Sequence, residues 1–110
     1  MPLHKVGKVS LHNGGGFVAK MKFKYTDTEG QSKISKRTGD ITLGKGRTVD
    51  PGELGVPDGS PIILQAFVRW GKDNEAGQQF MYEKGNAETA AYTITGTTGS
   101  NTLGFIGFQK

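Results

Sequence analysis

The sequence predicts an all-β protein, with one domain over residues 1–110 folded as an antiparallel β-sandwich of about eight short strands. Three observations lead to this fold class. Apolar and polar residues alternate with a period of two in several segments, and no segment shows the period of an amphipathic helix. Glycine accounts for 18 of the 110 residues, a share well above average, and turn signals recur at the spacing that is typical of sandwiches and barrels.

The clearest strand covers residues 17–25. Apolar residues from Phe17 to Tyr25 occupy every second position, and lysines fill most positions between them. This alternation is typical of an antiparallel strand with one buried face. An earlier strand is expected over residues 5–12. The sequence Asn-Gly-Gly-Gly at 13–16 predicts a hairpin between the two strands, because glycine adopts the positive φ of a tight turn.

Shorter strands follow a turn at residues 27–30. The strand expected at 33–37 has Ile34 as its one large apolar side chain, which indicates an edge strand, and its lysines discourage pairing with another sheet. Residues 41–43 and 47–49 are strand candidates on either side of a glycine turn. Residues 50–60 contain Pro and Gly repeatedly and indicate a long loop.

The second strong strand is expected at residues 61–70. Both of its faces are apolar, which indicates a central position in a sheet. Trp70 would lie at its end, on the same face as Ile62 and Leu64. Three more strands are predicted at 78–82, 89–95 and 102–108. Inward-facing positions are expected for Phe17, Phe23, Phe67 and Phe105.

The composition excludes several kinds of chemistry. The chain has no cysteine, which excludes disulfides, thiolate metal sites and a cysteine nucleophile. No apolar run reaches the length of a membrane-spanning helix, and residues 1–13 lack the apolar core of a secretory signal. Localisation therefore stays unknown. The expectation is synthesis in the cytosol, with release by lysis or an unconventional route.

The motifs point away from enzymatic chemistry. Residues 39–45 match G-x-x-x-x-G-K, but a phosphate-binding loop continues with Ser or Thr and a helix, whereas Gly46 and a β-like segment follow here. We interpret this motif as a glycine turn. The two histidines, His4 and His12, have no nearby acid in the sequence, and the carboxylates are scattered. We therefore expect no catalytic residues, no metal site and no cofactor.

Charge is distributed unevenly along the chain. Residues 1–50 contain ten Lys and Arg and four Asp and Glu, giving +6, whereas residues 51–110 contain four and six, giving −2. A region of one sign favours an anionic partner such as phospholipid headgroups, nucleic acid or an acidic glycan. A charged surface that only keeps the protein in solution is the alternative interpretation.

Lysines gather on one predicted strand face. Lys20, Lys22 and Lys24 repeat at about 6.7 Å, which is twice the rise per residue of a strand. Because like charges at this spacing repel, nearby acids or an anionic ligand should compensate them. Asp27 and Glu29, just past the strand, are candidates for this compensation.

Residues near strand ends complete the candidate site. Trp70 precedes a polar loop at 71–77, and an aromatic ring next to water suits sugar stacking or insertion at a bilayer interface. This loop and the one at 96–101 would supply hydrogen-bonding groups. The predicted ligand-binding residues are Lys20, Lys22, Lys24, Trp70, Asp73, Asn74, Tyr82 and Asn101.

Short stretches resemble known β-sandwich families. Residues 11–17, followed by an alternating strand that ends at Tyr25, are similar to the early hairpin of actinoporins and of fungal fruit-body lectins. Residues 99–108 also resemble a strand of actinoporins, and residues 9–13 resemble aegerolysins. The resemblance implies a sandwich that docks on membranes or glycans. Residues 1–8 are too short and polar for the inserting helix of actinoporins, and their tyrosine cluster is not evident, so a complete pore former is not implied.

The first functional hypothesis is a non-enzymatic recognition protein that binds membrane lipid headgroups or glycans, in the role of a defence toxin, cytolysin or lectin. A barrel that binds single-stranded nucleic acid is an alternative. It is less favoured, because the lysines and aromatic rings of strand 17–25 point to opposite faces. A self-assembling structural protein is a further alternative, and a homo-oligomer is left open. A small hydrolase is favoured least.

Overall fold

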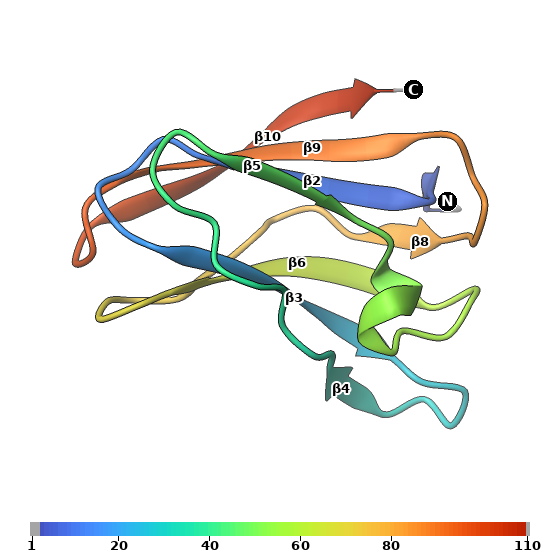
Figure 1. Ribbon diagram of the computed structural model, residues 1–110. Helices are drawn as coiled ribbons and strands as arrows, with labels where there is room; N and C mark the ends of the chain where they lie inside the picture. Colours follow the sequence, from blue (N-terminus) through green and yellow to red (C-terminus); the bar gives the residue numbers. More distant parts are fainter. Residues whose placement is uncertain (1–2, 110) are drawn as a thin grey trace.

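The computed structural model describes residues 3–109 and confirms the all-β class. Two sheets face each other across one core (Figure 1). The six-stranded sheet has the order β1 (Lys5–Val6), β8 (Phe80–Tyr82), β6 (Pro61–Val68), β3 (Ala19–Thr26) and β4 (Ser32–Ile34), with β7 (Asn74–Glu75) also paired to β6. The four-stranded sheet has the order β10 (Asn101–Gln109), β9 (Thr89–Gly96), β2 (Lys8–Asn13) and β5 (Gly46–Val49). A short 3-10 helix, η1 (Pro51–Leu54), follows β5.

Alternate side chains of both sheets fill the core, as the period of two predicted. In β3, Ala19, Met21 and Phe23 are fully buried. The central position predicted for residues 61–70 is confirmed, since β6 pairs with β3, β7 and β8. Phe17 is buried and Phe105 packs against the core, whereas Phe67 lies elsewhere, as described below.

Two strand pairs are parallel, which departs from the antiparallel sandwich predicted by the sequence. β2 pairs in parallel with β9, and β1 with β8. The predicted hairpin at residues 13–16 is wrong, because β2 and β3 belong to different sheets. Both sides of β2 are occupied, by β5 and β9, so the chain must cross to the other sheet. Gly14 and Gly16 donate their N–H groups to the carbonyls of Ile94 and Gly96, which fixes the crossing against β9.

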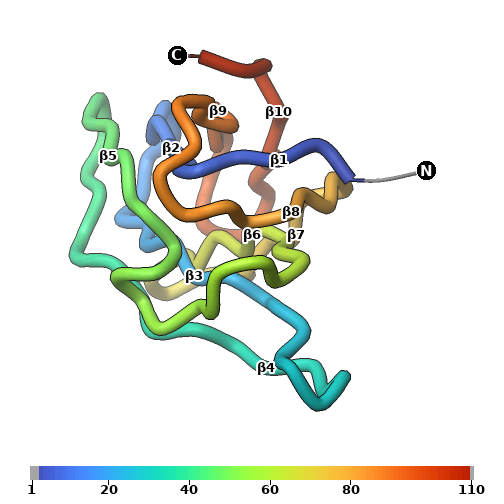
Figure 2. The backbone as a smooth tube through the Cα atoms, turned by 90° about the vertical axis from the view of Figure 1, so that its right-hand side faces the viewer, coloured from blue at the N-terminus to red at the C-terminus, as the bar shows by residue number. Residues whose placement is uncertain are grey.

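Gly7 divides the first predicted strand into β1 and β2, which lie in different sheets. A side chain at Gly7 would collide with the backbone of Asn86, and the Gly7 N–H donates to the Glu88 carbonyl over 2.9 Å. Only glycine permits such a close approach of two backbones. Figure 2 shows the chain leaving β1, beside β8, and entering β2.

Hydroxyl groups replace part of the β-ladder along the outer side of β3. The edge strand predicted at 33–37 is shorter than expected, and β4 covers only the last residues of β3. Beyond β4, Ser35 Oγ accepts the Phe23 N–H (2.8 Å) and Thr38 Oγ1 accepts the Met21 N–H (2.9 Å). An irregular segment of this kind protects a strand from pairing with another chain.

Asn13 joins three segments at the point where the chain crosses between the sheets. Its side chain is fully buried. Nδ2 donates to the carbonyl oxygens of Phe17 (2.6 Å) and Ile41 (2.9 Å), and Oδ1 accepts the N–H of Gly15 (2.9 Å). The Asn13 backbone also pairs with the turn at residues 44–45. A single residue thus fixes β2, the crossing and the turn before β5 relative to one another.

The strand registers gather the connecting loops at two ends of the sandwich. Ala19, at the start of β3, opposes Val68 at the end of β6. Gly96, at the end of β9, opposes Asn101 at the start of β10. The end that we call the loop end therefore carries residues 14–18, 42–45, 69–73 and 97–100, and it lies on the left in Figure 1. The opposite end carries residues 27–31, 50–60 and 83–88.

We expect Asn13→Ala to lower the free energy of unfolding by about 3 kcal/mol, because it leaves the buried Phe17 carbonyl and the Gly15 N–H without partners and removes one of the two donors to the Ile41 carbonyl. Urea unfolding followed by circular dichroism measures the change. His12→Ala, at the exposed neighbouring position, is the control and should alter stability by less than about 0.5 kcal/mol. Similar effects of the two substitutions would contradict the role assigned to Asn13.

Candidate functional site

Trp70 protrudes from the turn that follows β6. The strand ends at Val68, and Trp70 has a φ of 61°, so it leaves the buried face on which the sequence placed it. Its side chain is 92% exposed. Within residues 3–109 it is the one non-glycine residue with a positive φ, a conformation that is unfavourable for an L side chain. Strained backbone of this kind concentrates at functional sites.

The turn that carries Trp70 is held against the turn between β9 and β10. The Lys72 N–H donates to the Thr98 carbonyl over 3.0 Å. Gly71 lies so close to Thr98 that a side chain at Gly71 would collide with its backbone. The two loops predicted to supply binding groups, 71–77 and 96–101, are therefore in direct contact.

A polar pocket of about 240 Å³ lies between these two loops, lined by Lys72, Asp73, Asn74, Gly99, Ser100 and Asn101. Asn74 Nδ2 donates to the backbone carbonyl (3.2 Å) and to the side-chain Oδ1 (2.7 Å) of Asn101. Asn101 Nδ2 donates to the Lys72 carbonyl over 2.9 Å. The structure thus brings together three predicted residues, Asp73, Asn74 and Asn101. The hydrogen bonds of Asn74 and Asn101 fix the geometry of this pocket.

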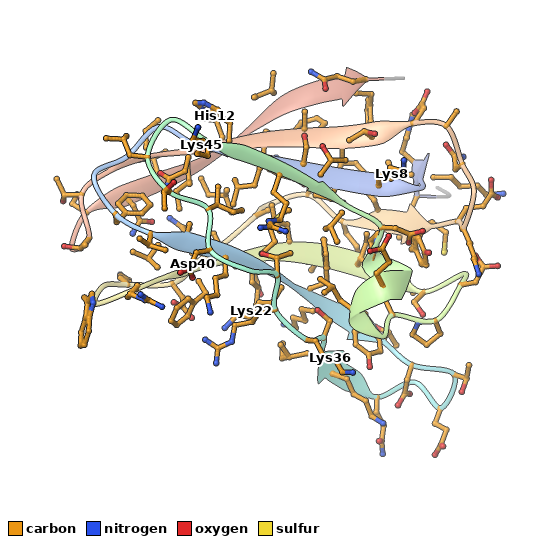
Figure 3. The ribbon with its side chains drawn as sticks, in the orientation of Figure 1. Lys8, His12, Lys22, Lys36, Asp40 and Lys45 are labelled. Carbon is orange, nitrogen blue, oxygen red and sulfur yellow. The ribbon has the colours of Figure 1, made fainter. Side chains whose placement is uncertain are left out.

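A second apolar residue is exposed at the loop end. Leu43, in the turn before β5, is 62% exposed. Leu43 is not among the residues predicted from the sequence, although an apolar residue in a glycine turn is a usable signal for an exposed tip. Lys45 and Lys72 are also exposed here, and neither has a carboxylate within 4.0 Å among residues 3–109. In Figure 3, Lys45 lies toward this end and Lys8 toward the opposite one.

Each lysine of the predicted row has a carboxylate partner. The Nζ–O distances are 3.5 Å for Lys20 and Asp40, 3.0 Å for Lys22 and Asp73, and 4.0 Å for Lys24 and Glu75. The expectation that Asp27 compensates the row is wrong. Asp27 accepts two N–H groups of its own turn and pairs with Lys33 at 3.2 Å. The row is therefore largely neutralised by Glu75 of β7 and by Asp40 and Asp73 from the segments outside the strands.

Phe67 lies on the face of the lysine row and not in the core. It opposes Lys20 in the β3–β6 register. The central guanidinium carbon of Arg37 is 4.4 Å from its ring centroid, and Lys22 Nζ is 5.9 Å from it. Lysines and rings do point to opposite faces within β3, where Phe23 is buried. The neighbouring strand nevertheless supplies a ring to the lysine face, which the sequence argument had overlooked.

Acidic residues gather at the opposite end of the sandwich. Seven of the ten lie there, namely Asp27, Glu29, Asp50, Glu53, Asp58, Glu83 and Glu88. The other three are the partners of the lysine row. The loop end is the more positive of the two, so an anionic surface would attract the molecule with Trp70 foremost.

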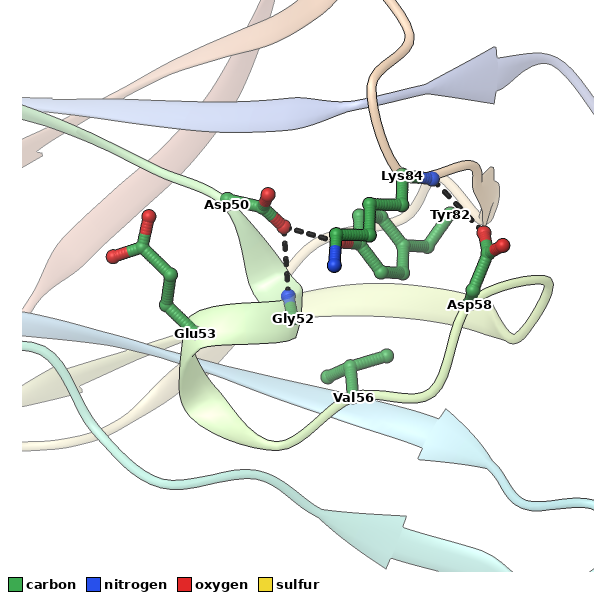
Figure 4. Close-up of a pocket in the computed structure, with 7 residues that line it drawn as sticks. All are labelled: Asp50, Gly52, Glu53, Val56, Asp58, Tyr82 and Lys84. Atoms are coloured by element: carbon green, nitrogen blue, oxygen red, sulfur yellow. Dashed lines mark hydrogen bonds between the residues drawn. The ribbon is translucent and has the colours of Figure 1, made fainter.

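Tyr82 is separate from the other predicted residues. It is buried at the opposite end, where its hydroxyl donates to Asp50, which also accepts the Gly52 N–H over 2.8 Å. These residues, with Glu53, Val56, Asp58 and Lys84, line a pocket of about 330 Å³ (Figure 4). Burial, together with the hydrogen bond to Asp50 and the charge of that carboxylate, raises the pKa of Tyr82 to about 12. The hydroxyl is therefore already engaged within the protein.

Neither histidine lines the two pockets described above. His4 contacts Glu88 and stacks on Phe108 with ring centroids 3.9 Å apart, whereas His12 is exposed. In the described part of the chain, no group of three or more His, Cys, Asp or Glu side chains is arranged to hold a metal ion. Residues 3–109 also contain no helix with the length and apolar character to cross a membrane.

Comparison of the sequence with protein-family models and with curated proteins finds no match. Similar folds occur in listeriolysin O (TM-score 0.49, 15% identity over 92% of this chain), pneumolysin (0.49, 13%, 92%) and the human-specific toxin intermedilysin (0.47, 13%, 94%). The chain covers only 22–23% of the length of these proteins. The solved structures that are similar to this chain include toxins. The narrower resemblance to actinoporins, fruit-body lectins and aegerolysins stays a prediction.

We expect Trp70→Gly to raise the free energy of unfolding by about 1 kcal/mol, because glycine removes the strain of the left-handed conformation. Trp70→Ala keeps the Cβ and the strain, so its stability should stay within about 0.5 kcal/mol of the parent protein. Denaturant unfolding of the three proteins measures both effects. A loss of stability in Trp70→Gly would show that the exposed ring supports the fold.

We expect stability to fall as the pH rises from about 10 to about 12, because an unfolded tyrosine loses its proton near pH 10 while folded Tyr82 keeps it. Burial also raises the pKa of Tyr92, which adds to the loss in the same direction. Tyr82→Phe should therefore reduce the slope of stability against pH without abolishing it. Urea unfolding at several alkaline pH values measures the slope, and an unchanged slope would contradict the assignment.

Proposed function

We propose that this chain is a non-enzymatic recognition protein that docks its loop end on a membrane surface. In this account Trp70 and Leu43 enter the bilayer interface. The pocket between residues 72–74 and 99–101 takes a lipid headgroup or a sugar that is displayed there. Such a protein suits the toxin or lectin role expected from the sequence.

The exposed and strained Trp70 carries this proposal. A tryptophan ring is large and apolar, and leaving it in water forgoes about 2 kcal/mol of burial. Its backbone conformation adds a further penalty. A partner that covers the ring would offset both the exposure of the ring and the backbone penalty. The bilayer interface is the environment in which tryptophan is enriched, because the apolar ring and the polar N–H are both accommodated there.

The surroundings of Trp70 support a membrane as the partner. Leu43 adds a second apolar tip at the same end, and Lys45 and Lys72 add positive charge, with no carboxylate of the described residues within 4.0 Å of either ammonium group. Lysines near an anionic leaflet attract it with about 1 kcal/mol each. Two apolar tips and two lysines at one end therefore combine insertion into the bilayer interface with electrostatic attraction to its headgroups.

The polar pocket favours a second candidate function, the binding of a glycan. Its side chains include an ammonium group, a carboxylate, a hydroxyl and two amides, and aromatic stacking by Trp70 would complete a sugar site. The same groups can bind the hydroxyls of a lipid headgroup. A glycan array, read with the parent protein and with Asn101→Ala, distinguishes a free-sugar ligand from a lipid.

Nucleic acid is less favoured as the partner, although Phe67 and Arg37 do share a face with the lysine row. The carboxylates of Asp40, Asp73 and Glu75 lie among those lysines and would repel a phosphate backbone. Electrostatic binding of nucleic acid also weakens steeply with salt. The absence of salt-sensitive binding to immobilised single-stranded DNA would exclude this alternative.

Trp70 is the only tryptophan of the chain, so its fluorescence reports docking directly. With vesicles of phosphatidylcholine and phosphatidylserine, we expect the emission to shift to shorter wavelength and iodide quenching to decrease. Trp70→Ala should weaken vesicle flotation by about tenfold or more, since burying such a ring is worth more than 1.4 kcal/mol. Leu43→Ser should weaken it less.

Lys24→Gln is the matched control, because it removes a lysine from the row and leaves the loop end intact. We expect its flotation to equal that of the parent protein. The proposal fails if the emission stays unshifted with every vesicle tried, including vesicles with sphingolipid and glycolipid. It also fails if Trp70→Ala floats as well as the parent protein does.

A further inference from the structure

The last strand, β10, differs from the other strands at the sheet edges. Strands β1, β4 and β5 are two to four residues long and carry Lys5, Lys33 and Arg47, respectively. β10 has nine residues and no ionisable side chain. Short length and charge are the devices that prevent an edge from pairing with another chain. β10 has neither of them.

The free backbone groups of β10 can be assigned from its register with β9. Thr97 and Ser100 exchange N–H···O bonds of 2.9 and 3.3 Å, and such pairs alternate along an antiparallel ladder. The groups of Leu103 and Phe105 therefore point away from β9, as do those of Asn101. The Asn101 carbonyl does accept the Asn74 Nδ2 on that side, which agrees with the assignment. In the described structure, no strand pairs with this side of β10.

We propose that two copies of this chain associate through β10, antiparallel, about a two-fold axis at Gly104. In this register Leu103 of each copy exchanges hydrogen bonds with Phe105 of the other. The two Gly104 residues then face each other in a pair without hydrogen bonds, with Cα atoms about 4.5 Å apart. An antiparallel strand edge is complementary to itself, so the contact closes as a dimer.

Charge selects a second copy as the occupant of this edge. The chain carries a net charge of +4, and pairing β4 or β5 with itself would bring lysines or arginines together. β10 has no ionisable side chain, so it can meet its own copy in any register without opposing like charges. Ile106 and Phe108, 61% and 42% exposed, add apolar surface beside the contact. This inference goes beyond the proposed docking function and does not depend on it.

The dimer should be weak. A register shift between Phe105 and Gly107 ends the regular part of β10, so the paired stretch is short. Its area stays below the roughly 800 Å² per partner of a standard interface.

Antiparallel pairing also directs the two loop ends away from each other, since β10 begins at the loop end. A dimer would therefore present its two Trp70 tips to two different surfaces.

Sedimentation of the parent protein over a range of concentrations up to about 1 mM tests for a weak dimer. Gly104→Lys should abolish the dimer, because two ammonium groups would meet at the axis. A Cβ at Gly104 has room, with Thr93 as its nearest neighbour at 3.9 Å, so the variant should fold. Thr48→Lys, on the opposite edge of the same sheet, is the matched control and should still dimerise. A protein that stays monomeric throughout would overturn the proposal.

Cross-linking tests the register independently of the stability of the dimer. The chain lacks cysteine, so Gly104→Cys introduces a single thiol at the axis. We expect it to form a disulfide-linked dimer under mild oxidation, at least tenfold faster than Thr48→Cys. Equal rates for the two variants would overturn the β10 contact, as would a dimer that persists in Gly104→Lys.

Vesicle clustering then separates this inference from docking. With phosphatidylcholine and phosphatidylserine vesicles, turbidity reports bridging and flotation reports docking. Gly104→Lys should float as the parent protein does but lose the increase in turbidity, whereas Trp70→Ala should lose both. If the parent protein floats and Gly104→Lys clusters vesicles equally well, the β10 dimer is contradicted while the docking proposal stands. If neither floats, the docking proposal fails and sedimentation alone decides the dimer.

Discussion

The buried side chain of Asn13 is the constraint on which the rest of the structure depends. The chain leaves the four-stranded sheet at this residue and enters the other sheet six residues later, at Ala19. An amide supplies two donors and one acceptor at once, and all three are used by backbone groups from two separate segments. No apolar side chain could satisfy these groups, and a carboxylate would face two carbonyls. The position of every loop at this end follows from that junction.

A rigid junction explains how strained and exposed residues persist beside it. Trp70 stays in a left-handed conformation because Gly71 and Lys72 are held against the β9–β10 turn. That turn adjoins Gly96, whose carbonyl accepts the N–H of Gly16 from the crossing segment. The crossing is in turn held by Asn13. Binding groups placed on a scaffold that is already ordered lose little entropy when a ligand arrives.

Much of the fold could be predicted from the sequence, because each strong strand carries its own pattern. The alternation in residues 17–25 and the two apolar faces of residues 61–70 identified β3 and the central β6. The pairing could not be predicted. A hairpin and a crossing between sheets both begin with Asn-Gly, and only the occupation of both sides of β2 decides between them. The place of Phe67 was also missed, because its cover comes from distant parts of the chain, namely Arg37 in the irregular segment after β4 and Lys22 on β3.

The candidate site was predicted in part. The sequence predicted that two polar loops supply hydrogen-bonding groups, and contact between these loops does bring Asp73, Asn74 and Asn101 to one pocket. The charge pattern was misleading, because the excess of lysine in residues 1–50 does not form one basic face. Folding places acids beside the lysine row and gathers most of the others at the far end. The resulting asymmetry lies between the two ends of the sandwich, which no linear count reveals.

The central claim is that the loop end is the part of the molecule that meets a membrane. Amide hydrogen exchange, with and without phosphatidylserine-containing vesicles, tests it most directly. The account predicts slower exchange in residues 42–45, 69–73 and 97–101 on binding, with no change at 27–31 and 51–60. Protection that is confined to the lysine row of β3, or to the acidic end, would contradict it.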